Sequence, residues 1–501
     1  MNWIKRIGGT LAMILFLVTG PAIYVGQAQQ PRSSPSPVST PSVPAQKTMA
    51  GIWVGVVEVS GLKIRIILRI LQDSGGALTA RLDVPDQGAS DLPIEVITVE
   101  GKLVHFEASK LGTYEGMLNN DASEIFGQLK QGPTALPVTF KRTDKAPTLG
   151  RPQDPQKPYP YIEEEVSYEN KIDAVKLAGT LTLPQSKGPF PAVVLITGSG
   201  SQDRNETTFG HRPFLVLADH LTRLGIAVLR VDDRGMGGSS PGSPTATSEN
   251  FAGDVLAGVE FLKNRKEVDP REIGLIGHSE GGMIAPMAAI RSKDVSYIVM
   301  MAGTGLPGDE VIQAQTRLLL KAQGAEDEGI RLTLDLFDAV FAILKKKGDS
   351  VATEREIRET LAAKTAAMTE VERKGLSQIL TTIDTQLKQF YLFDWFRFFL
   401  RYDPRVTLRK VQIPVLALNG EKDLQTAPKE NLDGIAAALK EGGNKGFSIV
   451  LLPQLNHLFQ TSRTGMLTEY GEIEETISPI ALKTISDWIL KVTTRRITEK
   501  H

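Results

Sequence analysis

The chain has 501 residues, of which 41% are hydrophobic and 23% charged, and is therefore long enough for two or three globular domains. Lys and Arg number 57 and Asp and Glu 58, so the net charge of −1 lacks the basic excess that is typical of nucleic-acid-binding proteins. The sequence contains no cysteine, which excludes disulfides, thiolate catalysis and zinc–cysteine sites.

The N-terminal segment 1–28 has the layout of a secretory signal peptide. A Lys-Arg pair precedes the apolar run 11–18, and Gly26-Gln27-Ala28 offers small residues where a signal peptidase cleaves. We therefore expect export to the periplasm or the extracellular space, with cleavage after Ala28. The alternative is an uncleaved membrane anchor, because the apolar stretch 7–25 approaches the ~20 residues that span a bilayer.

Two segments of different composition follow. Residues 29–48 are rich in Pro, Ser and Gln, which indicates a disordered linker. From 49 to 143 the chain changes to short alternating runs, separated by turn residues such as Asp73-Ser74-Gly75-Gly76. The expected strands are 54–59, 62–68, 77–82, 95–99, 103–106 and 136–140. This spacing predicts a small antiparallel β-rich domain, a sandwich or a barrel, whose role is in folding or positioning.

A second linker, the Pro-rich stretch 144–160, precedes the largest predicted domain, 161–495. Apolar strand-like runs alternate there with helix-like segments. Strands are expected at 181–183, 192–196, 227–231, 273–276, 297–301, 415–418 and 447–451, and helices at 214–224, 250–264, 283–290 and 480–492. Runs that are apolar on both faces predict an α/β fold with a mostly parallel sheet between helices.

The alternation stops within 306–402, where helical spacing predominates. A helical block inserted between two strands of such a sheet predicts a lid over the cleft at the strand ends. A dimerisation surface is the alternative. Aromatic residues gather between Phe393 and Phe399, and they fit either the wall of an apolar pocket or the core of the block.

The most informative motif is Gly277-His278-Ser279-Glu280-Gly281, a G-x-S-x-G pattern between a predicted strand and a predicted helix. In this context the serine sits on a sharp turn that exposes its hydroxyl above the sheet, and the glycines avoid clashes with the strand and the helix. A second copy, Gly238-Ser239-Ser240-Pro241-Gly242, follows no strand and lies among prolines, which predicts a loop. Ser279 is therefore the expected nucleophile.

A serine hydroxyl needs a base to take its proton, and a histidine is the expected partner. The histidines are His105, His211, His220, His278, His457 and His501. His278 lies inside the elbow, where we expect it to point away from the serine. Since the partners in this fold follow in the order serine, acid, histidine, only His457 and the terminal His501 qualify. His457 follows the strand 447–451, so we expect it to be the general base.

The acid that orients this histidine is expected after an earlier strand. Asp423 lies just beyond the strand 415–418, where a carboxylate can hold His457 and stabilise its imidazolium. Glu421 is its nearest rival, and Asp433 is expected on a later helix.

Two backbone N–H groups are expected to bind the oxyanion. One belongs to Glu280, the residue after the nucleophile, and the other to the Gly-rich loop after the strand 192–196. Within that loop the amides of Ser199, Ser201 and Gln202 all qualify.

Residues 161–491 resemble the α/β-hydrolase fold, and within it the exported bacterial esterases of the serine-aminopeptidase-like and dienelactone-hydrolase-like group. The resemblance rests on three stretches, TGSGSQDRNE at 197–206, DDRGMGGS at 232–239 and GHSEGG at 277–282. It implies that Ser279, Asp423 and His457 form a catalytic triad and that Asp232-Asp233-Arg234-Gly235 is mainly structural, with Arg234 and an aspartate bracing loops. The first stretch departs from the lipases because it lacks their His-Gly pair.

These residues predict a serine hydrolase that cleaves small-molecule acyl esters through an acyl-enzyme. An amide or peptide hydrolase with the same triad and a non-catalytic binding protein are the alternatives. The stretches at 198–200 and 235–237 do not complete G-x-G-x-x-G, and neither a P-loop nor an H-E-x-x-H spacing occurs, so we expect no cofactor and no metal. Membrane association is expected only if the N-terminal segment stays uncleaved.

Overall fold

A computed structural model describes residues 49–59, 62–73, 75–85, 89–108, 111–131, 134–145, 150–346 and 348–498. The predicted signal peptide 1–28 and linker 29–48 lie outside these residues, as does part of the linker 144–160. The described residues form two compact units. The first comprises the residues up to Gly150 together with Thr208–His211, and the second comprises Arg151–Thr207 and the residues from Arg212 onward. No helix within the described part of the chain has both the length and the apolarity to cross a membrane.

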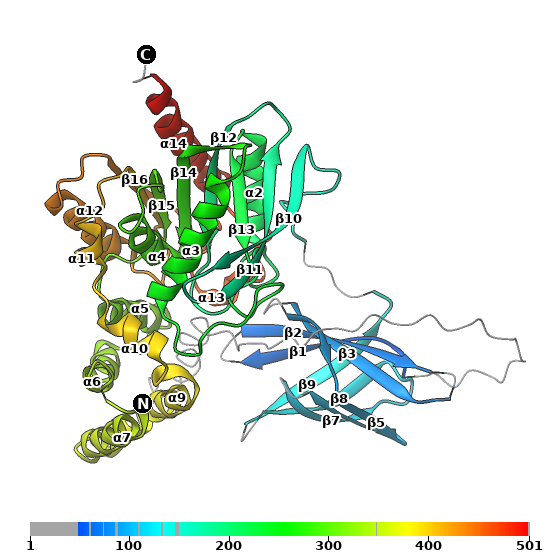
Figure 1. The fold of residues 1–501 in the computed structure, drawn as a ribbon. Coiled ribbons are helices and arrows are strands. Elements are labelled where there is room, and N and C mark those ends of the chain that lie inside the picture. The colour runs from blue at the N-terminus through cyan, green and yellow to red at the C-terminus, as the bar shows by residue number, and fades with distance from the viewer. Residues whose placement is uncertain are drawn as a thin grey trace, which may run out of the picture. The chain divides into compact units, whose positions relative to one another are not determined.

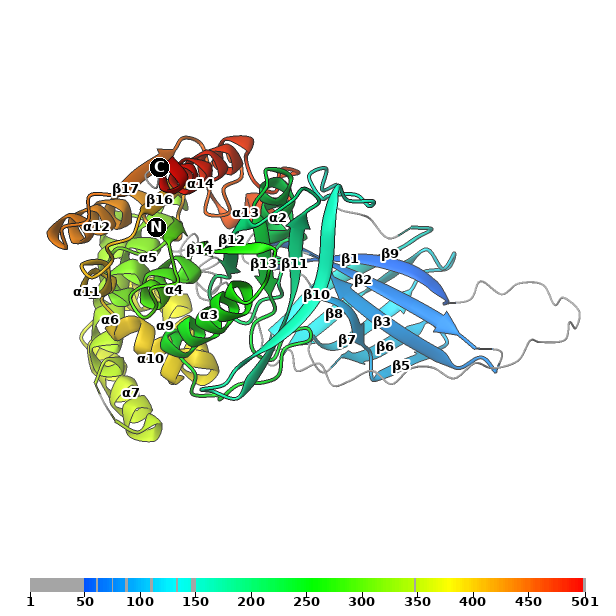
Figure 2. The same ribbon diagram turned by 45° about the horizontal axis from the view of Figure 1, so that its top comes forward.

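The first unit is a β domain on one nine-stranded sheet, in the order β4-β3-β2-β1-β9-β8-β7-β6-β5. Its strands are β1 (Gly51–Val59), β2 (Leu62–Gln72), β3 (Leu78–Val84), β4 (Ala89–Pro93), β5 (Val96–Glu100), β6 (Leu103–Ala108), β7 (Gly112–Leu118), β8 (Glu124–Gln131) and β9 (Thr134–Thr143). All neighbours pair antiparallel, and β3 also contacts β5, so the sheet curls around a core that includes Trp53, Phe106 and Tyr114 (Figure 2). The predicted antiparallel β domain is confirmed.

Three of these strands, β4, β7 and β8, were not among the predicted ones. Gly116 in β7 and Gly127 in β8 weaken the strand pattern, because glycine has no side chain to pack. The two glycines pair directly across the ladder and leave room for the Tyr114 ring, from which a Cβ on Gly127 would lie only 2.7 Å away. Packing around that buried ring thus favours glycine where sequence pattern alone indicates a turn.

The second unit is built on an eight-stranded sheet, in the order β10-β11-β13-β12-β14-β15-β16-β17 (Figure 1). Its strands are β10 (Tyr161–Asn170), β11 (Val175–Pro184), β12 (Phe190–Ile196), β13 (Ala227–Val231), β14 (Val268–His278), β15 (Tyr297–Met301), β16 (Val415–Gly420) and β17 (Phe447–Leu452). The pairs β10–β11 and β11–β13 are antiparallel, and the pairs from β13 through β12 to β17 are parallel. The strand β10 was not predicted, since Glu163, Glu164 and Glu165 interrupt its apolar pattern.

Helices cover both faces of this sheet, namely α2 (Pro213–Arg223), α3 (Ser248–Lys263), α4 (Glu280–Ala289), α12 (Pro428–Glu441) and α14 (Pro479–Thr498). The short helix α13 (Leu467–Tyr470) lies between β17 and α14 in the chain. Val194 and Leu275 belong to one core with α3, α4 and α12, whereas Val193 and Ile276 belong to a second core with α2 and α14. Successive strand residues point to opposite faces, so β12 and residues 273–277 of β14 are apolar because both of their faces are covered.

A helical segment lies between β15 and β16. It comprises α5 (Gly308–Ala322), α6 (Asp327–Leu344), α7 (Ser350–Ala366), α8 (Glu370–Gly375), α9 (Ser377–Gln386), the π-helical turn η3 (Leu387–Tyr391), α10 (Asp394–Arg401) and α11 (Pro404–Leu408). Figures 1 and 2 show α6, α7, α9 and α10 grouped together, and Phe341, Tyr391 and Phe396 pack ring against ring inside the group. Part of the aromatic cluster at 393–399 therefore forms a helix core, whereas Trp395 is half-buried and reaches toward α4.

Candidate active site

Ser279 lies at the turn between β14 and α4. Its backbone has φ 54° and ψ −115°, a conformation that side-chain-bearing residues rarely adopt, and its N–H donates to the carbonyl of Met301 at 2.8 Å. Such strain persists only where the surrounding structure enforces it, and it is often found at functional sites. The predicted strand–serine–helix context is therefore present at Ser279.

The glycines on either side of Ser279 are required by close backbone approaches. A Cβ on Gly277 would lie 2.0 Å from the carbonyl oxygen of Gly281, and one on Gly281 would lie 2.2 Å from the carbonyl oxygen of Ile196. Neither obstacle is a movable side chain. The turn thus packs directly against the end of β12, which brings Ser279 close to the loop that follows this strand.

The structure brings Asp423 and His457 together from the loops after β16 and β17. His457 Nδ1 lies 2.8 Å from Asp423 Oδ2, and the two residues are 5% and 1% exposed. The other carboxylate oxygen, Oδ1, accepts the N–H groups of Gln425 at 2.7 Å and Thr426 at 2.9 Å. These backbone donors fix the carboxylate, which in turn fixes the tautomer and the orientation of the imidazole.

The rival acids lie elsewhere. Glu421 Oε2 accepts the N–H of Gln454 at 3.0 Å, and Asp433 pairs with Lys429 on the exposed side of α12. No contact joins either carboxylate to His457 among the described residues. His501, the other histidine that the chain order allowed, lies outside the described residues.

The candidate oxyanion donors differ in whether their N–H groups already donate a hydrogen bond within the protein. The Gln202 N–H donates to Asp233 Oδ2 at 2.8 Å, which argues against its being available to an oxyanion. In the described part of the chain, the N–H groups of Ser199, Ser201 and Glu280 donate to no protein acceptor. Glu280 begins α4, where unpaired N–H groups and the helix dipole favour negative charge.

The side chain of Glu280 is buried beneath the turn. Its Oε1 accepts hydrogen bonds from Ser248 Oγ at 2.6 Å and from Trp395 Nε1 at 2.8 Å. Burial raises the pKa of this carboxyl, although hydrogen bonds from Ser248, Trp395 and Ser199 oppose the shift. Trp395 belongs to α10, so this carboxyl joins the helical segment to the turn that carries Ser279.

His278 has partners that sequence reasoning did not identify. Its Nδ1 lies 2.9 Å from Glu206 Oε1 and its Nε2 lies 3.0 Å from the carbonyl oxygen of His457. Burial opposes a charge on this ring, but Glu206, the His457 carbonyl and Asp423 outweigh it and raise the pKa of His278. The only sequence signal for Glu206 is its place in the stretch TGSGSQDRNE.

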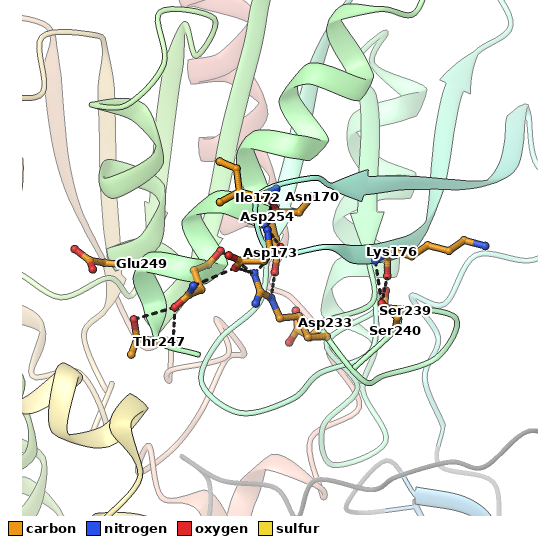
Figure 3. Close-up of polar contacts among 12 residues, drawn as sticks. Asn170, Ile172, Asp173, Lys176, Asp233, Ser239, Ser240, Thr247, Glu249 and Asp254 are labelled. Carbon is orange, nitrogen blue, oxygen red and sulfur yellow. Dashed lines mark hydrogen bonds and ion pairs between the residues drawn. The ribbon is translucent and has the colours of Figure 1, made fainter. Parts of the chain in front are cut away.

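The second of the three stretches, DDRGMGGS, links loops through ion pairs. Arg234 pairs with Asp173 and Asp254, both labelled in Figure 3, and Asp232 pairs with Arg204. Removal from water raises the pKa of Asp233 well above its usual range, although it accepts hydrogen bonds from the Gln202 amide and the Thr197 hydroxyl. These contacts agree with a bracing role for Arg234.

The second G-x-S-x-G copy forms a loop beside β11. Ser240 Oγ accepts the N–H of Lys176 at 2.9 Å (Figure 3). Ser239 Oγ donates to the carbonyl of Asp232 at 2.7 Å. Neither serine adjoins a strand or a helix, because β13 ends at Val231 and α3 begins only at Ser248. Within the described residues, no group of His, Asp or Glu side chains has the arrangement of a metal site.

Comparison with known proteins assigns this chain to a family. Residues 193–465, more than half of the chain, match the model of the alpha/beta hydrolase family. The chain is 28% identical over 332 residues to esterase EstD of Thermotoga maritima. The alignment covers 66% of this chain and 69% of that esterase. It is 27% identical over 164 residues to the putative hydrolase YtaP of Bacillus subtilis, across 29% of this chain and 51% of the other.

Solved structures also align with this chain, at lower identity. The Pyrococcus furiosus esterase PF2001 aligns with a TM-score of 0.40 and 16% identity, over 69% of this chain and 98% of the esterase. A dienelactone hydrolase from Anabaena variabilis aligns with a TM-score of 0.34 and 14% identity, over 66% and 99% of the two chains. On the family-model match, this chain belongs to the α/β-hydrolase family.

Proposed function

We propose that this α/β hydrolase is a serine carboxylic ester hydrolase that works through an acyl-enzyme. The observation that carries the proposal is the buried Asp423–His457 pair, 2.8 Å apart, in the same fold unit as the strained turn at Ser279. The resemblance to a Thermotoga maritima esterase supports the choice of an ester as substrate.

In the first half of the reaction, Ser279 Oγ attacks the acyl carbon of the ester. His457 Nε2 accepts the hydroxyl proton, and Asp423 stabilises the resulting imidazolium through Nδ1. The tetrahedral intermediate then collapses, and the leaving alkoxide takes the proton from His457 and departs as the alcohol. The acyl group is left on Ser279.

The oxyanion that forms on the carbonyl oxygen is bound by two N–H groups. We assign one to Glu280 and the other to Ser199 or Ser201, because these amides donate to no protein acceptor in the described part of the chain. A donor of this kind contributes roughly 3 kcal/mol to lowering the barrier in enzymes where it has been measured.

In the second half, water attacks the acyl-enzyme. His457 takes a proton from that water and returns it to Ser279 Oγ as the carboxylic acid leaves. Each proton that His457 accepts is released in the same half-reaction, so no cofactor is needed to balance the cycle.

A covalent probe tests the proposal. A fluorophosphonate should label the wild-type chain at Ser279, and Ser279→Ala should abolish both labelling and hydrolysis of p-nitrophenyl esters. A series of acyl chain lengths, together with the matching anilides, would separate an ester hydrolase from an amide hydrolase. Retained labelling in Ser279→Ala would remove Ser279 from the proposal, and an unlabelled, inactive wild type would favour the binding-protein alternative.

We also propose that the segment α5–α10 is a lid over the acyl site. The hydrogen bond from Trp395 to Glu280 supports this assignment, because it ties the segment to the residue after the nucleophile. A lid that contacts the acyl chain should resist proteolysis more strongly after labelling with a long-chain alkyl fluorophosphonate than with a methyl one. A dimerisation surface would instead show equal proteolysis and a mass that depends on concentration.

The contact itself can be tested by Trp395→Phe, which keeps an aromatic ring but removes the N–H. Leaving the buried Glu280 acceptor with one donor fewer should lower the free energy of unfolding by about 1–3 kcal/mol. The matched control is Trp488→Phe, since Trp488 Nε1 donates to no protein acceptor among the described residues. Equal losses in the two variants in urea titrations would contradict a specific link through Glu280.

We further propose export, on the sequence of residues 1–28. Mass spectrometry of the chain recovered from cells should find a new N-terminus after Ala28. An intact N-terminus in the membrane fraction would instead indicate the uncleaved anchor.

A further inference from the structure

The imidazole of His278 lies between two hydrogen-bond acceptors. Its Nε2 faces the carbonyl oxygen of His457 at 3.0 Å, and because a carbonyl can only accept, this nitrogen carries a hydrogen. Its Nδ1 faces the carboxylate of Glu206 at 2.9 Å. The ring and the carboxylate side chains are 7% and 5% exposed, so water supplies little of their solvation. A ring that donates from both nitrogens is an imidazolium.

The Glu206 carboxylate is placed to stabilise the positive charge on the His278 ring. The same oxygen, Oε1, accepts the N–H of Gly198 at 2.7 Å, and the Glu206 backbone adopts a φ of 54° to place it there. The charged or titratable groups that face His278 are Glu206, from the loop after β12, and Asp423 and His457, from the loops after β16 and β17. Both carboxylates favour the protonated ring, which agrees with the direction of its pKa.

This chain of contacts joins three loops of the site. Glu206 accepts the N–H of Gly198, which lies in the same loop as Ser199 and Ser201. A Cβ on Gly198 would lie 3.4 Å from the Cβ of Ser279, so this loop lies directly beside the nucleophile. His278 then holds the backbone of His457 itself, and the two imidazole rings are 4.8 Å apart.

We propose that His278 is a positioning residue, kept as an imidazolium by Glu206, that fixes the backbone of His457 and the oxyanion loop relative to Ser279. The inference rests on the proposed function, and it assigns to His278 and Glu206 no contact with the substrate. Because correct placement matters most in the transition state, loss of the charge should lower kcat more than it changes KM.

The decisive variant is Glu206→Gln. Both hydrogen bonds reach the same oxygen, so a glutamine oxygen can accept both while the negative charge is lost. The ring of His278 should then lose its extra proton at neutral pH and regain it in acid. We expect kcat to fall about tenfold relative to wild type at pH 8, the scale of losing one hydrogen bond to a charged group, with KM changed less than about threefold. The ratio of variant to wild-type kcat should rise toward one as the pH is lowered to 6.

His278→Gln completes the test, because its side chain does not titrate. Its kcat should be low by a factor that is independent of pH. The matched control is His220→Gln, since His220 is a half-buried histidine whose Nε2 lies 3.1 Å from Ser486 Oγ, away from these loops. This control should keep the wild-type kcat and pH profile.

Two results would overturn the inference. Wild-type kcat in both Glu206→Gln and His278→Gln would show that the contacts do not position the site. A deficit in Glu206→Gln that is equal at every pH would show that shape rather than charge matters. Ser279→Ala distinguishes failure of the proposed function from failure of the positioning role. If it retains turnover, the proposed function fails. If it is inactive while the His278 and Glu206 variants match wild type, only the positioning role fails.

Discussion

The two G-x-S-x-G stretches of this chain share a pattern but differ at each position that chemistry needs. The residue after Ser279 is Glu280, which is the first residue of α4 and has an N–H to donate. The residue after Ser240 is Pro241, which has no N–H. The residue before Ser279 is His278, which contacts Glu206 and His457, whereas the Ser239 hydroxyl bonds to the backbone of Ala178 and Asp232. A serine between glycines therefore becomes a candidate nucleophile only where a strand ends, a helix begins and partners from other loops arrive.

Replacing each serine in turn should give the largest contrast between the two stretches. Ser279→Ala removes the proposed nucleophile, so kcat for p-nitrophenyl esters should fall by at least about 10⁴-fold. Ser240→Ala removes a hydroxyl that accepts the Lys176 N–H and donates to the Lys176 carbonyl, and its turnover should match wild type. A comparable loss in both variants would mean that the difference in context does not separate the two serines.

The next contrast concerns the acid. Asp423→Asn keeps the size of the side chain but favours the wrong tautomer of His457, and kcat should fall by about 10⁴-fold. Glu421→Gln lies in the same turn and keeps an oxygen for the Gln454 N–H, so its activity should be unchanged. Steady-state kinetics on short-chain esters checks both, and a stronger effect of Glu421→Gln would reverse the assignment.

The glycines of the two stretches should differ in stability rather than in chemistry. A Cβ on Gly281 would meet the carbonyl oxygen of Ile196 at 2.2 Å, so Gly281→Ala should destabilise the fold by about 3 kcal/mol. A Cβ on Gly242 would lie 2.6 Å from Cδ of Arg234, a side chain that Asp173 and Asp254 hold but that can adjust more than backbone, so Gly242→Ala should cost less, about 1 kcal/mol. Urea titrations of the two variants measure the difference, and equal midpoints would contradict it.

The smallest expected effect is the pH dependence of stability at His278. Its pKa is raised in the folded state above the unfolded value of 6.5, so the folded state binds more protons just above pH 6.5. The stability that this ring contributes should be complete below pH 6.5 and should decline as the pH rises through the folded value. The advantage of wild type over His278→Gln in free energy of unfolding should therefore shrink as the pH rises above 6.5.

His220 provides a control of opposite sign. Burial lowers the pKa of His220, so its contribution is present above pH 6.5 and is lost as the pH falls through the folded value. The advantage of wild type over His220→Gln should grow with pH. If both differences move in the same direction, the charge state inferred for His278 is wrong.

The candidate site was partly accessible from sequence because its parts follow the chain order of the fold. Ser279 is marked by its glycines, and His457 and Asp423 follow from their places after predicted strands. The role of Glu206 was not accessible, because 72 positions separate it from His278 and nothing local indicates that they meet. The hydrogen bond from the Gln202 N–H to Asp233 could not be predicted from sequence for the same reason.

By itself, the sequence determined the antiparallel β domain, the alternation of strands and helices, and the serine turn. These features depend on side-chain periodicity and on local backbone freedom, which neighbouring residues encode. Only the tertiary structure decided which acid meets His457, which amides are already engaged, and that His278 and Trp395 contact groups far away in the chain. Those outcomes depend on how loops from separate strands meet at one edge of the sheet, and no local pattern records such distances.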